Sequence, residues 1–212
     1  LTKILKNISE PSRRTGFDRN YWIWEEPKEG KDYILVADVA RGDGSDFSVA
    51  HIFDTETMTQ VAEYHGTITP DMFAPLLYTM AKEYNTALLI AENNSLGIGV
   101  LSRLQDMEYS NLYYSMKSTH EYVDEVTAQS VGAVVGFTMS MKTRPLVIAK
   151  FEEFVRNKLI NINSRRLANE IKTFVWHNGR PQAMRSYNDD LVIAACIGCW
   201  VRETALTVNK RD

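Results

Sequence analysis

Residues 34–49 read ILVADVARGDGSDFSV. The first half is apolar and β-forming except for one aspartate, Asp38, and a glycine-rich turn with two further aspartates leads into a second apolar run. Apolar runs separated by such turns are typical of neighbouring strands. A carboxylate inside an apolar run is costly to bury unless it is paired, protonated or bound to a metal. The stretch therefore predicts two strands joined by a turn, with an acid at the end of the first strand that requires an explanation.

The patterns that follow extend this pair into the element order βββαβαβ. Short connections between the first three strands suit an antiparallel meander, and Thr69 followed by Pro70 marks the start of a helix. A strand, a helix and a further strand then form the unit that joins parallel strands. We therefore expect an α/β fold with a mixed five-stranded sheet flanked by helices. The strands are predicted at 33–40, 47–54, 59–66, 86–92 and 111–116, and the helices at 69–85 and 98–107.

The remaining chain divides into an N-terminal arm and a helical C-terminal part. Residues 1–30 show no sustained period and are interpreted as a linker or arm, so that the main domain spans 31–212. Residues 117–140 are weakly patterned. Asn178 and Gly179 between extended segments predict a β-hairpin. Helices are predicted at 143–159, at 164–174 and from residue 187 onward.

Composition narrows the class of protein. A length of 212 residues with 44% hydrophobic residues is sufficient for one substantial core. Cys196 and Cys199 lie in an apolar helical run, which favours buried thiols over a metal or redox motif. Neither a long apolar run nor a signal peptide is present, so we expect no membrane association. The chain begins with Leu1, which indicates a fragment of a longer protein.

The formal net charge of −3 conceals an asymmetry between two parts of the chain. Residues 142–185 contain ten Lys and Arg against three acids, which gives this segment +7 and the remainder −10. Such a segment is either a solvated helix face or the contact surface of a polyanion. The candidate DNA-binding residues are Lys142, Arg144, Arg165, Arg166, His177, Arg180 and Arg185.

Acidic residues recur at three places where elements begin or end. Asp38 is near the end of the first main strand, Glu92 ends the fourth, and Asp189 and Asp190 open the last helix. Each has an ordinary explanation alone, because a strand-end acid can point into solvent and aspartates favour helix starts. Their combination on three separate elements suggests a shared site.

This combination resembles the ribonuclease H-like fold, in which a first-strand Asp, a fourth-strand Glu and a late-helix Asp converge. Three motifs narrow the resemblance to the large terminase subunit of tailed double-stranded DNA bacteriophages: ADVARGDGSDFSV (37–49), LLIAENNSLGIGV (88–100) and YNDDLVIAACIGCW (187–200). The resemblance implies the nuclease domain of a DNA-packaging motor, an endodeoxyribonuclease that cuts concatemeric viral DNA with little sequence specificity.

The resemblance also implies cofactors, partners and a location. Two Mg²⁺ or Mn²⁺ ions would be bound by Asp38, which both share, and by Glu92 and Asp190, with Asp46 and Asp189 as weaker candidates. Carboxylates suit these cations because Mg²⁺ and Mn²⁺ prefer oxygen ligands. The chain lacks the phosphate-binding loop of the ATPase domain that terminases carry, so that domain would belong to the same full-length chain. Double-stranded DNA, the portal and the small terminase subunit are the expected partners, at the prohead in the host cytoplasm.

Three other functions remain open at this point. Another ribonuclease H-like nuclease, such as a junction resolvase or an integrase, would share the fold. An actin-like ATPase lobe also begins with an Asp-bearing strand and a glycine turn, although it needs a second lobe. A non-catalytic docking module of the packaging motor is the third alternative.

Overall fold

A computed structural model describes residues 4–44, 46–116, 122–124, 127–128, 131–177 and 180–205. Its main element is a six-stranded sheet in the order β1-β2-β5-β4-β3-β6. Strand β6 runs parallel to β3, and the other neighbours are antiparallel. The strands are β1 (Arg13–Thr15), β2 (Tyr21–Ile23), β3 (Tyr33–Asp38), β4 (Ser48–Asp54), β5 (Gln60–Gly66) and β6 (Leu88–Ala91).

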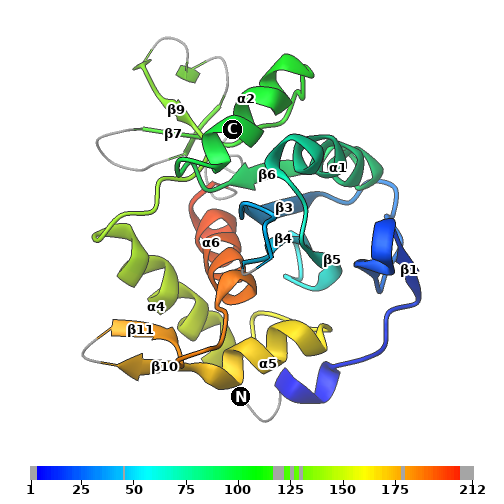
Figure 1. The fold of residues 1–212 in the computed structure, drawn as a ribbon, viewed down its shortest axis with the longest axis vertical. Coiled ribbons are helices and arrows are strands. Elements are labelled where there is room, and N and C mark those ends of the chain that lie inside the picture. The colour runs from blue at the N-terminus through cyan, green and yellow to red at the C-terminus, as the bar shows by residue number, and fades with distance from the viewer. Residues whose placement is uncertain are drawn as a thin grey trace.

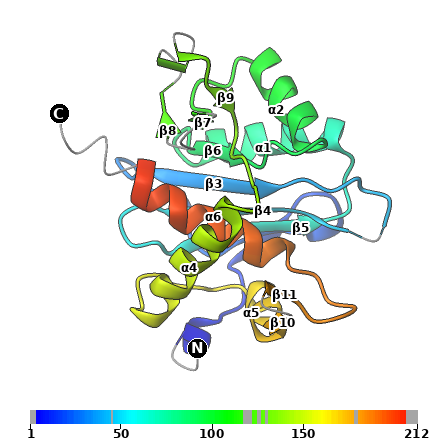
Figure 2. The same ribbon diagram turned by 90° about the vertical axis from the view of Figure 1, so that its left-hand side faces the viewer.

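Helices cover both faces of this sheet (Figures 1 and 2). Helices α1 and α2 lie on one face and α4, α5 and α6 on the other. Their bounds are α1 (Pro70–Glu83), α2 (Gly97–Asp106), α4 (Thr143–Arg156), α5 (Arg165–Thr173) and α6 (Asp190–Ala205), and short 3-10 helices span Ile4–Asn7 and Phe17–Arg19. Each face has its own buried cluster. Ile34 and Val36 of β3 pack against α6, whereas Leu35 and Ala37 face α1 and α2.

The predicted α/β class and the order βββαβαβ from residue 33 onward are confirmed. The main sheet has six strands instead of the predicted five, and its two edge strands differ from the prediction. Residues 13–23 add β1 and β2 beside β5, because Tyr21 and Ile23 bury apolar side chains against that edge. The predicted strand 111–116 forms a bridge to β6 through Leu112, and its end then joins a small sheet instead. That sheet contains β7 (Tyr114–Ser115), β8 (Tyr122–Val123) and β9 (Val134–Val135).

The C-terminal elements also follow the sequence closely. Strands β10 (Phe174–His177) and β11 (Arg180–Ala183) form the predicted hairpin, whose turn residues 178 and 179 lie outside the described part. Cys196 and Cys199 are buried free thiols on α6, as expected. Among the described residues, no helix is both long and apolar enough to cross a membrane.

Candidate active site

Two of the three predicted acids lie side by side at one edge of the sheet. Ala37 and Ala91 are register partners in the parallel pair β3 and β6, so Asp38 and Glu92 follow them on neighbouring strands. The Glu92 backbone N–H donates to the Ala37 carbonyl oxygen at 3.4 Å. The sheet register therefore fixes the spacing of these two carboxylates.

The turn after Glu92 places the backbone of that residue against the start of α2. The Asn94 side chain accepts hydrogen bonds from the backbone N–H groups of Leu96 and Gly97, at 3.1 and 2.8 Å. A Cβ atom at Gly97 would overlap with the Glu92 carbonyl oxygen. The Glu-x-Asn-x-x-Gly motif therefore has a physical basis, since only glycine permits this approach.

Helix α6 brings the third acid to the same edge. Its Asp190 accepts a hydrogen bond from the Phe47 backbone N–H, in the segment that leads into β4, and senses the charge of Asp38. The other side-chain oxygen, Oδ2, is buried and has no hydrogen-bond partner in the described part of the chain. A buried acceptor without a partner is unusual in a folded protein and indicates a missing ligand or proton.

Asp189 has a different environment from Asp190. Its carbonyl oxygen accepts the first helical bond of α6, from Ile193 at 2.8 Å, which is the N-cap position. The side chain instead contacts Arg144 of α4, with 3.3 Å between Nη2 and Oδ2. Asp189 thus lies next to Asp190, but its side chain is paired with Arg144.

Sequence reasoning missed Glu170 of α5, which lies against the start of α6. Its Oε2 accepts the Val192 backbone N–H at 3.1 Å, so it satisfies an amide at the start of α6. Burial, with a smaller contribution from the charge of Asp190, raises the pKa of Glu170 to about 8, against the opposing hydrogen bond from the Val192 N–H. The available signal was a charged residue between Leu167 and Ile171 on the apolar face of the helix.

The acids at this end of the strands have raised pKa values. Burial, and next the nearby charge of Glu92, raise the pKa of Asp38 to about 7. Burial likewise raises the pKa of Asp190 to about 7, with Asp38 as the next cause. The pKa of Glu92 is also raised by burial, against the opposing charge of Arg144. Carboxylates that repel one another and are short of solvent are poised to accept a cation.

These residues fit divalent cations by their chemistry. The donors are carboxylate oxygens, which Mg²⁺ and Mn²⁺ prefer, and the unpartnered Oδ2 of Asp190 is free to ligate. In the described residues, no three His, Cys, Asp or Glu side chains are grouped around one point as ligands of a single ion. A pair of ions that share Asp38 does not need such a group, because each would contact Asp38 and one further acid.

These raised pKa values predict how stability depends on pH without a cation. Asp38 and Asp190 stay protonated up to about pH 7 in the folded chain, whereas unfolded carboxyls lose their protons near pH 4. The folded state therefore binds more protons in this interval, and its stability should fall as the pH rises from about 4 to about 7. The fall should be smaller in Asp38→Asn. Urea unfolding in EDTA across this range measures it, and identical pH slopes for the two proteins would contradict the assignment.

The other predicted residues lie at varying distances from the acids. Asp46 is exposed and acts on Asp190 only as a weak neighbouring charge. Gly42 has a positive φ of 80°, and its turn passes so close to the Ile68 carbonyl that a side chain would clash. Lys142, Arg180 and Arg185 are exposed, and Arg165 is largely exposed beside Glu10. The side chain of His177 lies outside the described part.

Arg166 is held inside the protein by a buried cluster. Its Nε donates to Oε1 of the fully buried Glu63 at 2.6 Å, and its guanidinium lies 3.6 Å from the centre of the Trp22 ring. Gln60 donates to Glu63 and bonds His51, whose Nε2 lies 2.9 Å from the Leu191 carbonyl oxygen. Arg166 thus connects the sheet to the start of α6, and we exclude it from the DNA-contacting residues proposed below.

Comparison with known proteins gives no match by sequence. No family model matches the chain, and no curated protein does. Solved structures do match. The large terminase nuclease of thermophilic phage G20c with bound cobalt has a TM-score of 0.69 at 15% identity, over 93% of this chain and 94% of that one.

The chain has the fold of a large terminase nuclease. The nuclease domain of Thermus phage P74-26 superposes with a TM-score of 0.62 at 15% identity, over 92% of this chain and 90% of that one. The manganese-soaked, inhibitor-bound terminase nuclease domain of human cytomegalovirus gives 0.50 at 11% identity, over 83% and 86%. The G20c nuclease has also been solved with magnesium and with zinc. The terminase-nuclease fold thus spans nearly the whole chain.

Proposed function

We propose that this chain is a metal-dependent endonuclease that cuts double-stranded viral DNA during genome packaging. The observation that carries the proposal is the convergence of Asp38, Glu92 and Asp190, from three separate elements, at one edge of a terminase-nuclease fold. The buried, unpartnered oxygen of Asp190 supports a cation at that point. We propose little sequence specificity, since phosphate contacts carry no sequence information directly.

The three acids would hold the cations, with Asp38 between Glu92 and Asp190. Two divalent cations bound there would supply charge neutralisation at the scissile phosphate and activation of the attacking water. The protein's own contribution is orientation. The sheet register sets Asp38 beside Glu92, the Phe47 N–H fixes one oxygen of Asp190, and Glu170 holds the first turn of α6. Arg144, which contacts Asp189, would offset part of the negative charge when no cation is bound.

DNA would approach across the exposed basic residues on α4, the hairpin and the segment before α6. Lys142 stands at the start of α4, and Arg180 and Arg185 precede Asp190 on the chain. We propose that these residues contact phosphates and that His177 joins them. Arg165 is available only if its exposed pair with Glu10 opens. Such exposed pairs are weak, so phosphate can compete for the guanidinium.

The wider context belongs to the proposal as well. The domain would comprise residues 31–212 together with strands β1 and β2, which belong to the same sheet, and the rest of residues 1–30 would connect it to an ATPase domain of the same full-length chain. The portal and the small terminase subunit would be its partners, at the prohead in the host cytoplasm. The likeness of fold to terminase nucleases motivates each of these assignments.

Plasmid cleavage by the isolated chain tests the proposed function. We expect supercoiled plasmid to become nicked and linear in Mg²⁺ or Mn²⁺, and to stay intact in EDTA, because the acids alone cannot neutralise the phosphate. Linear products with ends at many positions would support low sequence specificity. An intact plasmid at all cation concentrations, with a folded protein by circular dichroism, would contradict the proposal.

A further inference from the structure

The turn between β1 and β2, residues 16–20, lies at the same end of the strands as the candidate active site. In register, Asp38 pairs with Val49, and Val49 pairs with His65. The His65 backbone N–H then donates to the Asn20 carbonyl oxygen at 3.4 Å. Asn20 is thus three strand positions from Asp38, or roughly 14 Å at about 4.8 Å per strand.

The adjoining strands present side chains to the same face of the sheet as Asp38. Arg14 is the register partner of Trp22, Trp22 of Glu63, and Glu63 of His51, which in turn pairs with Val36 of β3. Directly opposed residues in a sheet point to one face. Val36 packs against α6, so Arg14 and Trp22 lie on the α6 side as well.

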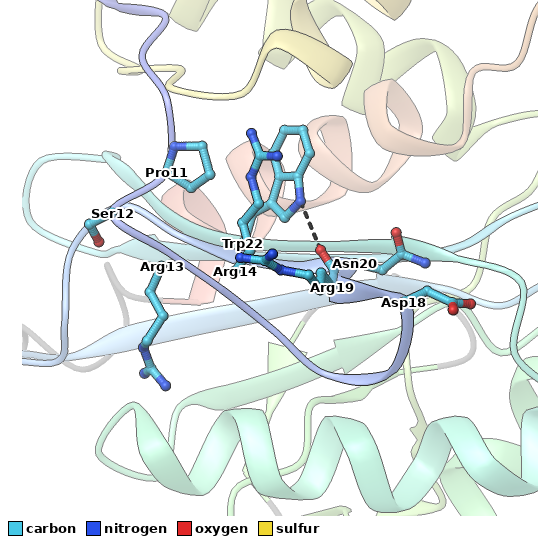
Figure 3. A pocket seen from close by; sticks show the side chains of 8 residues that line it. All are labelled: Pro11, Ser12, Arg13, Arg14, Asp18, Arg19, Asn20 and Trp22. Carbon is cyan, nitrogen blue, oxygen red and sulfur yellow. Dashed lines mark hydrogen bonds between the residues drawn. The ribbon is translucent and has the colours of Figure 1, made fainter.

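A surface hollow of about 520 Å³ opens on this side between the two strands and the chain before them. Figure 3 shows the side chains around it, with the Trp22 indole N–H directed at the Arg19 carbonyl oxygen, 3.1 Å away. Arg14 and Arg19 line the hollow against one carboxylate, that of Asp18, whereas the Arg13 side chain turns toward α1, where it pairs with Glu83. The lining residues are Pro11, Ser12, Arg13, Arg14, Asp18, Arg19, Asn20 and Trp22.

The three arginines differ in what already holds them. Arg13 pairs with Glu26 and Glu83, and Arg14 lies 4.5 Å from the centre of the Trp22 ring while pairing with Glu10. Arg19 is exposed and forms no ion pair within the described residues. Arg19 is therefore the cation of this hollow with the most freedom to take an external anion.

The turn itself has two features that its own packing does not explain. The side chain of Phe17 is 90% exposed, the most of any large hydrophobic side chain in the described part of the chain. Asp18 and Arg19 both have left-handed backbone angles, with φ of 57° and 53°. Such conformations are strained in non-glycine residues and concentrate at functional sites. An exposed aromatic ring beside arginines is typical of nucleic-acid contacts.

We propose that the turn 16–20 and the hollow behind it bind the phosphate backbone of the DNA duplex next to the cut, with Arg19 as the main contact. The inference rests on the proposed function, since it takes the cut phosphate to lie at the acids. A distance of roughly 14 Å corresponds to about four base pairs at roughly 3.4 Å each, within one turn of the same duplex. Arginine suits this role because its planar fork binds phosphate with two hydrogen bonds. Phe17 would pack against the sugar or an adjacent base.

Binding and cleavage measured separately test this proposal with Arg19→Gln and Phe17→Ala. The binding probe is a short blunt duplex of mixed sequence, titrated in EDTA at several salt concentrations. We expect Arg19→Gln to raise Kd several-fold and to lower the salt slope by about one phosphate contact. Under cleavage conditions KM should rise several-fold while kcat stays unchanged, because the contact is equal in ground state and transition state. Phe17→Ala should raise Kd without changing the salt slope.

Lys28→Gln is the matched control, since it removes one exposed positive charge at the opposite end of the strands from Asp38. The Lys28 backbone N–H donates to the hydroxyl of Tyr33, the first residue of β3. Its Kd and melting temperature should equal those of the wild type. If the wild type cuts DNA while Arg19→Gln binds with unchanged Kd and salt slope, the turn proposal is overturned and the nuclease proposal stands. If the wild type does not cut in Mg²⁺ or Mn²⁺, the nuclease proposal fails whatever Arg19 does.

Discussion

Replacing Asp38 with asparagine should abolish plasmid cleavage in Mg²⁺ and in Mn²⁺ while leaving the fold intact. Asp38 interacts electrostatically with both Glu92 and Asp190, and an amide there withdraws the charge on which both proposed cations depend. Metal-supplied charge stabilisation of several kcal/mol corresponds to a loss of roughly a thousandfold or more in rate. Stability should be kept or rise slightly, because repulsion among the acids is relieved. Glu92→Gln and Asp190→Asn should behave alike.

Asp189→Asn is the matched control for this series. It makes the same chemical change on the adjacent residue, whose side chain pairs with Arg144. Asparagine also occupies helix N-cap positions nearly as well as aspartate. The variant should therefore retain measurable cleavage. Circular dichroism and Mn²⁺ titration of all four variants separate loss of fold from loss of metal. Normal cutting by Asp38→Asn would end the metal-nuclease interpretation, and activity in Asp190→Asn but not in Asp189→Asn would reverse the assignment of the pair.

The largest loss of stability is expected from Arg166→Met. This change leaves the carboxylate of Glu63, which is fully buried, without its cation. Breaking a buried ion pair on one side typically costs about 3–5 kcal/mol. Trp22 would also lose the guanidinium that lies 3.6 Å from the centre of its ring. Urea unfolding followed by tryptophan fluorescence measures the effect.

Arg165→Met provides the comparison at the neighbouring position. Its pair with Glu10 has both side chains about three-fifths exposed, and such surface pairs contribute between about 0 and 1 kcal/mol. Combining Arg166→Met with Glu63→Gln should cost less than the two single changes added together, because the second change removes the orphaned charge. Equal, small losses at 165 and 166 would contradict the buried role of Arg166. A loss of DNA affinity without loss of stability in Arg166→Met would restore its sequence-based assignment to DNA.

The parts of the fold that were readable from sequence are those set by local pattern. The three strands 33–38, 48–54 and 60–66 and the helix from Pro70 have strong alternation, turn and capping signals within a few residues. Asp38, Glu92 and Asp190 stood out because an acid in or beside an apolar run is visible without knowledge of its partners. Their mutual approach was inferred from a resemblance, and the register of β3 with β6 now accounts for two of them.

The features that could not be predicted from the sequence depend on contacts between distant segments of the chain. Glu170 and Arg166 are charged residues on a short helix, and only the docking of α5 on β5 and α6 makes them internal. Residues 13–23 have no sustained period, because three-residue strands carry too few positions to establish one. The strands become recognisable only through their antiparallel pairing with β5.

The position of Asp190 on the chain has a consequence for biosynthesis. Two of the proposed metal ligands come from strands in the first half of the chain, and the third comes from α6, the last helix of the described residues. Chains grow from the N-terminus at about 5–20 residues per second, so the sheet can pair before α6 has been made. During that interval a nascent chain has two of the three acids and cannot bind both cations. Hydrolytic capacity would thus arise only on completion of the domain, which protects nearby DNA from an enzyme that is still being synthesised.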